Sequence, residues 1–219
     1  TAAVSGRAFG IVAQNNGSGA LSIRSTGDVT GDYFAGIFAR NEGTDLTISA
    51  ASVSGETDGI YARNNGSGTL SVTASGAVTG KSRYGIYARN TSNGAGLTVS
   101  TASASGGLIG IVAVNFGSGA LSVRSTGRVT GGNYGIMADN YSGTDLTISA
   151  ASVSGGMGIY ARNRGTGDLS VTATGPVTGT TGRGIFALNV YTGLNLDVSA
   201  DDVTGATEGI HANSRGTGA

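Results

Sequence analysis

Side chains that commonly carry catalysis or bind metals are scarce in this chain. Its 219 residues include no cysteine and one histidine, His211. The lack of cysteine excludes a disulfide scaffold, a thiol nucleophile and cysteine-ligated zinc, and a single histidine excludes a multi-histidine metal site. Neither a phosphate-binding glycine loop nor a Gly-x-Ser-x-Gly nucleophile motif is present. The sequence therefore predicts a protein that is not an enzyme and has no cofactor and no metal.

The carboxylates offer two alternatives to that prediction. Asp145 and Asp168 occupy equivalent positions in neighbouring repeats, where a pair about 5 Å apart would match a retaining glycosidase. Asp45 and Thr69 fill the same positions earlier in the chain, which favours a turn role in which aspartate bonds local backbone. A second acidic group lacks the Gly-Gly-x-Gly-x-Asp spacing of calcium-binding β-rolls, so a solvated surface is favoured there. It consists of Asp197, Asp201, Asp202 and Glu208.

Aromatic and arginine side chains recur at fixed places in a repeated string, Gly-Ile-x-Ala-x-Asn. Aromatic rings beside guanidinium groups suit the recognition of sugars, sulfated glycans or proteins. The alternative is that they only stack between neighbouring repeats on a pleated surface. We define the candidate binding face as Phe38, Tyr61, Tyr87, Tyr160 and Phe186, which follow the Ile, with Arg40, Arg63, Arg89 and Arg162 two residues later.

The repeat that positions these residues runs through the whole chain. Gly-Ile-x-Ala begins at residues 10, 36, 59, 85, 110, 135, 158, 184 and 209. Each copy is followed by Leu-(Ser/Thr)-(Val/Ile) and then Val-(Ser/Thr)-Gly, with few departures. The three strings alternate apolar and polar residues and are separated by turn clusters such as residues 16–19. A unit this short cannot bury its own apolar face, so the units must stack.

This pattern predicts an all-β protein, a parallel β-helix or β-solenoid. We expect about nine rungs of about 25 residues, a rung being one turn of the chain, each with three short strands. Ile and Ala of the first string lie two residues apart and share one face, as do Leu and Val/Ile of the second. These residues are the predicted core, which leaves little room for a ligand inside.

An asparagine closes the first string in eight of the nine rungs. Asparagine amides one rung apart can donate to and accept from one another. We therefore predict a structural ladder of Asn15, Asn41, Asn64, Asn90, Asn115, Asn140, Asn163 and Asn189. The second string carries outward hydroxyls, as in Ser22 and Thr47, which suggest an ice-binding array. Arg24, Arg124 and Asp197 interrupt that array, so solubility of an exposed strand is the preferred interpretation.

A longer duplication lies over the short repeat. Residues 44–55 and 144–155 are identical, and residues 18–31 and 118–131 differ at two positions. The duplicated blocks are 18–80 and 118–179. Such copying is easy in a solenoid because each repeat contacts only its neighbours. We treat residues 1–219 as one β-helix segment and expect it to be part of a longer protein.

Residues 59–80, with Gly-Ile-Tyr-Ala-Arg-Asn followed by Leu-Ser-Val and Val-Thr-Gly, resemble the repeats of bacterial autotransporter (type V secretion) passenger domains. The resemblance extends through all nine rungs. It implies a right-handed β-helix that is carried outward by a membrane β-barrel elsewhere in the parent chain. It also implies a location at the bacterial cell surface or outside the cell, and many such passengers act in adhesion, in self-association or as effectors.

Charge and hydropathy exclude two kinds of partner. Thirteen basic residues balance thirteen acidic ones, which argues against a nucleic-acid partner. The sequence has no apolar run of 18 residues, so we expect no membrane insertion by this segment. We predict a rigid scaffold and adhesion surface whose partner is a host cell-surface protein, a sulfated glycan or a second copy of itself. The alternatives are an effector ligand for one host receptor and a self-assembling fibre. An ice-binding or polysaccharide-cleaving β-helix is less favoured.

Overall fold

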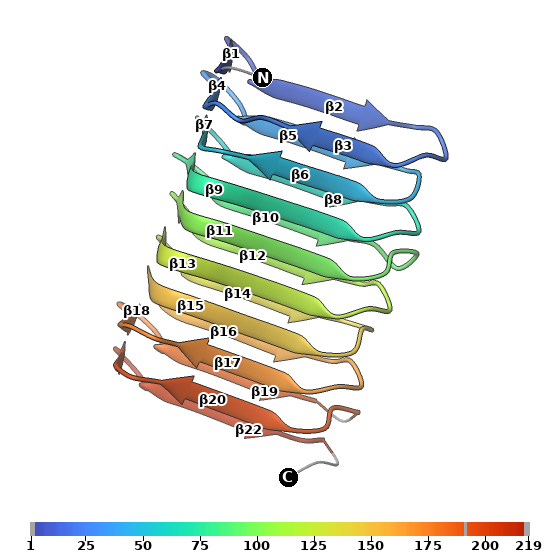
Figure 1. Cartoon of the computed structure of the whole chain (residues 1–219). Coiled ribbons are helices and arrows are strands. Elements are labelled where there is room, and N and C mark those ends of the chain that lie inside the picture. Colours follow the sequence, from blue (N-terminus) through green and yellow to red (C-terminus); the bar gives the residue numbers. More distant parts are fainter. Residues whose placement is uncertain (1–2, 191, 217–219) are drawn as a thin grey trace.

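The structure is a computed structural model that describes residues 3–190 and 192–216. These residues form strands and turns without any helix, and all paired strands are parallel. The strands stack in chain order from the N-terminus to the C-terminus (Figure 1), which makes a β-solenoid of about eight turns. The predicted all-β solenoid is thus confirmed.

The first string of each repeat builds one sheet, and the second and third strings build another. The nine-stranded sheet contains β2 (Ile11–Asn15), β5 (Ile37–Asn41), β8 (Ile60–Asn64), β10 (Tyr84–Asn90), β12 (Ile109–Asn115), β14 (Tyr134–Asn140), β16 (Met157–Asn163), β19 (Ile185–Asn189) and β22 (Ile210–Ser214). The thirteen-stranded sheet contains β1 (Val4–Gly6), β3 (Leu21–Arg24), β4 (Val29–Gly31), β6 (Leu46–Ala50), β7 (Val53–Gly55), β9 (Leu70–Gly80), β11 (Leu97–Gly106), β13 (Leu121–Gly131), β15 (Leu146–Gly155), β17 (Leu169–Ala173), β18 (Val177–Gly179), β20 (Leu196–Ala200) and β21 (Val203–Gly205).

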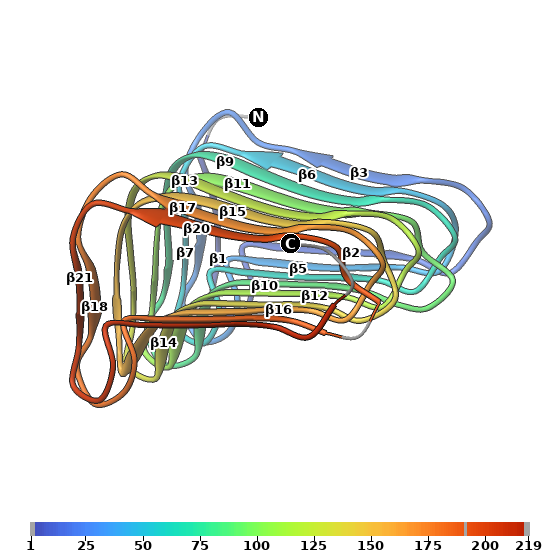
Figure 2. The same ribbon diagram turned by 90° about the horizontal axis from the view of Figure 1, so that it is seen from below.

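Central rungs differ from the predicted three strands. There the second and third strings form one continuous strand in β9, β11, β13 and β15, whereas they stay separate toward both ends. The linkers between the two strings differ by one residue from rung to rung, and the ladder absorbs the difference as a register shift, for example between Ser125 and Arg128. Figure 2, which looks along the stack, shows the two sheets lying over one another, with β18 and β21 at one side.

The core is a set of identical side chains stacked along the solenoid. Ile60 pairs with Ile86 and Ala62 with Ala88 in adjacent strands, and all four side chains are fully buried. Leucine and valine from the other sheet, such as Leu70, face them. Because strand residues alternate between faces, burial of Ile and Ala turns the residue between them to the outside.

Glycine ends each third string because the chain turns there against its own backbone. A Cβ built on Gly80 would overlap the carbonyl oxygen of Tyr84 and would lie 2.8 Å from the amide nitrogen of Gly59. That Tyr84 carbonyl accepts a hydrogen bond from the Gly59 amide at 2.9 Å. The glycine therefore lets the corner between the two sheets close tightly.

Candidate functional site

The aromatic column of the nine-stranded sheet is a stack of rings. Phe38, Tyr61 and Tyr87 follow one another in register, with ring centroids 5.2 and 4.8 Å apart and nearly parallel planes. The parallel strands pair in register, which places each of these rings directly over the ring of the next strand. Tyr160 stacks on Phe186 at 5.2 Å in the same way. The five predicted aromatic residues therefore form two separate stacks on one face.

Smaller side chains separate the two stacks. Val112 and Met137 lie in the same column between Tyr87 and Tyr160. The second stack continues to His211, whose ring lies 5.4 Å from that of Phe186. In a parallel stack each ring covers the face of its neighbour, so the inner rings present their edges to solvent. The parts of this face that a ligand could contact are therefore the ring edges and the adjacent arginines.

Arg40, Arg63 and Arg89 lie in register on three successive strands beside the first aromatic stack. Arg40 and Arg63 form hydrogen bonds to side chains of the turns that follow their strands. Nε of Arg40 lies 2.8 Å from Oε1 of Glu42, and Nε of Arg63 donates to Oδ1 of Asn65 at 2.7 Å. Asn65 in turn donates to Glu42 at 2.7 Å, and this bond lowers the pKa of the Glu42 carboxyl. The network fixes the direction of both guanidinium groups.

Arg89 has a different partner. Its guanidinium lies over the ring of Phe116, 4.8 Å from the centroid. Its Nε is buried and has no hydrogen-bond partner among the described residues. Phe116 in turn stacks on Tyr141 at 4.2 Å. A guanidinium held over an aromatic face keeps its full charge while losing conformational freedom, which prepares it for an acidic ligand.

Arg162 lies apart from the other three arginines and belongs to a cluster around Asp139. Asp139 is 1% exposed, and its Oδ2 accepts from Nε of Arg162 at 3.1 Å and from Nη2 of Arg164 at 3.2 Å. The Arg164 guanidinium lies 3.9 Å from the centroid of the Tyr141 ring. Burial raises the pKa of Asp139 to about 6, although Arg162 acts in the opposite direction.

This pKa shift makes stability depend on pH. The ordinary value is 3.8, so the folded chain holds the Asp139 proton more tightly than the unfolded chain between 3.8 and about 6. The stabilisation is complete below 3.8 and is lost as pH rises through 6. Asp139→Asn removes the titrating group. At about 1.4 kcal/mol per pKa unit, we expect the free energy of unfolding of this variant, relative to that of the wild type, to rise by about 3 kcal/mol from pH 3.5 to pH 7. Urea unfolding of both proteins across this range measures it, and a constant difference would contradict it.

The asparagines of the predicted ladder form hydrogen bonds along the stack. Nδ2 of Asn15 donates to Oδ1 of Asn41 at 2.7 Å, and five more bonds of 2.9–3.4 Å continue in the same direction to Asn163. Each Nδ2 also donates to a carbonyl of its own turn, such as Gly119 for Asn115. Asn189 differs, because its Oδ1 is buried without a partner among the described residues.

The carboxylates of Asp145 and Asp168 accept hydrogen bonds from backbone amides of the next rung. Oδ1 of Asp145 accepts from the amide of Asp168 at 2.8 Å, and Oδ1 of Asp168 accepts from the amide of Asn195 at 2.9 Å. Asp45 accepts from the amide of Thr69 in the same way, at 2.7 Å. These carboxylates join successive turns. The predicted bonds to local backbone are corrected here, because these carboxylates accept from backbone amides of the neighbouring rung.

No family model, curated protein or solved structure matches this chain. Within residues 3–190 and 192–216, no helix is long and apolar enough to cross a membrane, and no three His, Cys, Asp or Glu side chains gather as a metal site would need.

Sequence reasoning missed the contributions of the turns. Glu42, Asn65, Phe116 and Arg164 lie outside the repeated strings, so the strand pattern gives no signal for them. Two surface hollows were missed for the same reason. One, of about 430 Å³, is lined by Arg162, Arg164, Leu188, Val190 and Thr192. The other, of about 450 Å³, is lined by Phe9, Phe34, Ala35, Phe38, Thr57, Asp58, Tyr61 and Arg83.

Proposed function

We propose that this chain is a rigid, non-enzymatic scaffold whose nine-stranded sheet binds an acidic ligand at the bacterial surface or outside the cell. The resemblance of its repeats to autotransporter passengers supports the location. A sulfated glycan and an acidic stretch of a host cell-surface protein share the required chemistry, since both carry anionic groups that repeat along their length. The solenoid supplies a straight and stiff support for such a ligand.

The observation that carries this proposal is the column of Arg40, Arg63 and Arg89. Like charges directly opposite one another on adjacent strands destabilise a sheet, and one carboxylate, Glu42, is bound within the group. Across the nine strands of this sheet four arginines stand against one aspartate. An anionic ligand would remove the repulsion, and the contacts with Glu42, Asn65 and Phe116 hold the guanidinium groups in place for it.

Binding to a sulfated glycan tests the proposal directly. We expect a heparin-type oligosaccharide to bind the chain in a salt-sensitive way, because contacts between exposed charges are screened by salt. Replacing the column by Arg40→Gln, Arg63→Gln and Arg89→Gln together should weaken binding at low salt at least about tenfold and flatten its salt dependence. Isothermal titration calorimetry at several salt concentrations measures both.

A matched control lies on the other sheet. Arg24, Arg124 and Arg128 are exposed on β3 and β13, so Arg24→Gln, Arg124→Gln and Arg128→Gln remove the same charge from the opposite face. This control should retain most of the wild-type affinity. Equal losses in both triple variants would mean that net charge alone governs binding, and the proposed face would then be wrong.

A further inference from the structure

The hollow of about 450 Å³ lies where the chain passes from the thirteen-stranded to the nine-stranded sheet, beside the aromatic column but away from Arg40, Arg63 and Arg89. Its volume is within the range of small-molecule sites. Four of its eight lining residues are aromatic, and its charged groups are one ionic pair, with the Thr57 and Tyr61 side chains as further polar groups. Ligand sites commonly combine an apolar wall with a few convergent polar groups.

Asp58 and Arg83 are the ionic pair. The Asp58 side chain is 5% exposed, and its Oδ1 accepts a hydrogen bond from the amide of Tyr84 at 3.3 Å. Its Oδ2 lies 3.6 Å from Nη1 of Arg83, too far for a good hydrogen bond. The carboxylate therefore keeps acceptor capacity and the guanidinium keeps donor capacity. Burial raises the pKa of Asp58, as expected for a carboxyl beneath aromatic walls.

The aromatic walls come from two kinds of element. Phe34 belongs to a turn and stacks on Phe9 at 5.0 Å, whereas Phe38 belongs to β5 and is inclined to Phe9 by 60°. The parallel stack of the aromatic column therefore ends at Phe38, because the Phe9 ring is tilted against it. Phe34 is 49% exposed. A large apolar side chain in this position costs solubility, and a ligand that covers it would recover apolar burial.

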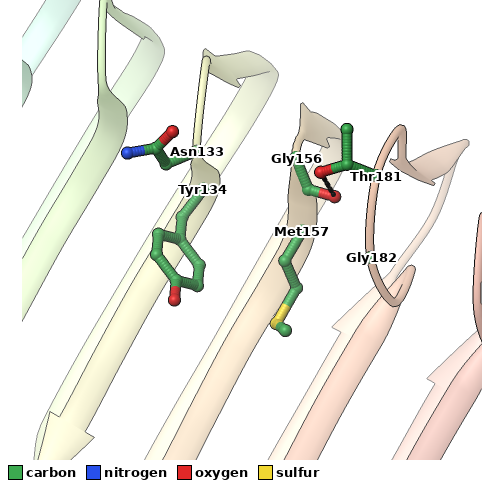
Figure 3. Close-up of a pocket in the computed structure, with 6 residues that line it drawn as sticks. All are labelled: Asn133, Tyr134, Gly156, Met157, Thr181 and Gly182. Carbon is green, nitrogen blue, oxygen red and sulfur yellow. Dashed lines mark hydrogen bonds between the residues drawn. The ribbon is translucent and has the colours of Figure 1, made fainter.

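The duplication provides a comparison within the same chain. Counted from the Gly-Ile string, the position of Asp58 is taken by Met157 in the second copy and that of Arg83 by Gly182. That corner also forms a hollow, of about 320 Å³, lined by Asn133, Tyr134, Gly156, Met157, Thr181 and Gly182 (Figure 3). In Figure 3 the Met157 side chain extends beside Tyr134, and the hollow has no charged group.

The second corner also lacks all three phenylalanines, since Phe9 corresponds to Ile109, Phe34 to Asn133 and Phe38 to Met137. Its strands nevertheless pair in the same register, for example Met137 with Tyr160 as Phe38 with Tyr61. The corner therefore folds without the ion pair and without these rings. Their presence in the first copy calls for a role other than folding.

We propose that the corner hollow of Phe9, Phe34, Phe38, Asp58, Tyr61 and Arg83 binds a single neutral sugar residue. The pair has no net charge, so Arg83 disfavours a cationic ligand and Asp58 an anionic one. Two adjacent hydroxyls of a sugar can donate to the carboxylate and accept from the guanidinium at once. The C–H face of the ring packs on the aromatic walls. This site shares Phe38 and Tyr61 with the candidate binding face, but Arg40, Arg63 and Arg89 are not among its lining residues.

Saturation-transfer NMR with the methyl glycosides of glucose, galactose, mannose and N-acetylglucosamine tests the site. We expect at least one of them to bind. The double variant Asp58→Met with Arg83→Gly should lower its affinity at least about tenfold, because the hydroxyls of the bound sugar lose both of their charged hydrogen-bond partners. Both replacements already occur in the second corner, so the fold accommodates them. Phe34→Ala, on a half-exposed side chain, is a second variant that should weaken binding severalfold.

Two control variants separate the outcomes. Met157→Ala with Thr181→Ala alters the second corner and should leave glycoside affinity unchanged, as should the triple arginine variant of the proposed acidic-ligand face. Absence of binding by all four glycosides would overturn the sugar site. Stronger binding of tetramethylammonium or of methyl glucuronoside than of any neutral glycoside would also overturn it. So would wild-type affinity in the Asp58→Met, Arg83→Gly variant.

Discussion

Replacement of Asn115 by alanine is expected to lower the free energy of unfolding by about 3–5 kcal/mol. The Asn115 side chain is fully buried, and its Nδ2 donates to Gly119 at 2.8 Å and to Asn140 at 3.1 Å. Its Oδ1 accepts from Asn90 at 3.4 Å and from the amide of Gly117 at 3.1 Å. Alanine leaves these four groups without that partner, and each buried polar group left unsatisfied costs about 1–3 kcal/mol.

Asn15→Ala is the control for this prediction. Asn15 makes equivalent bonds to Gly19 and Asn41, but it is only partly buried, so water can replace the lost amide. We expect a loss of about 1 kcal/mol. Urea unfolding followed by circular dichroism measures both variants. If Asn115→Ala costs no more than Asn15→Ala, continuity of the ladder contributes nothing beyond a local turn bond.

Gly80→Ala is expected to destabilise the fold by at least about 4 kcal/mol, because its Cβ would overlap backbone that no side-chain rotation can move. The carbonyl of Tyr84 would have to leave the amide of Gly59, which breaks the corner between β9 and β10. Thermal unfolding of the variant should show a large loss, with the thirteen-stranded and nine-stranded sheets both affected.

Gly19→Ala is the matched control on the opposite side of the rung. Nothing lies within 4 Å of a Cβ built on Gly19. Since φ is not positive at any described glycine, alanine fits the backbone there, and its lower unfolded-state entropy should change stability by no more than about 1 kcal/mol, in the stabilising direction. Similar melting temperatures for Gly80→Ala and Gly19→Ala would show that the corner can rearrange.

The fold could be predicted from the sequence because one period fixes both the strands and their faces. Ile and Ala two residues apart in Gly-Ile-x-Ala define an inward face, and repetition nine times leaves stacking as the way to bury it. Because side chains alternate between the two faces of a strand, Tyr61 and Arg63 were assigned to the outside. In-register parallel pairing places each of them beside its equivalent in the next rung.

The site contacts could not be predicted in the same way because turns decide them. The corner between the third and first strings holds four residues after Gly31, three after Gly55 and two after Gly155. No fixed spacing therefore indicates that Asp58 meets Arg83, or that Arg89 reaches Phe116. Comparison of the two duplicated copies is the sequence signal that would have found the corner, since Asp58 is replaced by Met157 within the blocks and Arg83 by Gly182 just after them.

The identical strings 44–55 and 144–155 also make the length of this protein adjustable. Slipped recombination between them would remove or add 100 residues and would rejoin the chain inside one strand pattern, with every core position kept in phase. Four rungs at about 4.8 Å each change the reach of the rod by about 19 Å. Recombination can thus change the length of the rod without a new sequence, and loss of the 100 residues would remove Asp58, Tyr61 and Arg83 from the corner hollow while leaving Phe9, Phe34 and Phe38 in place.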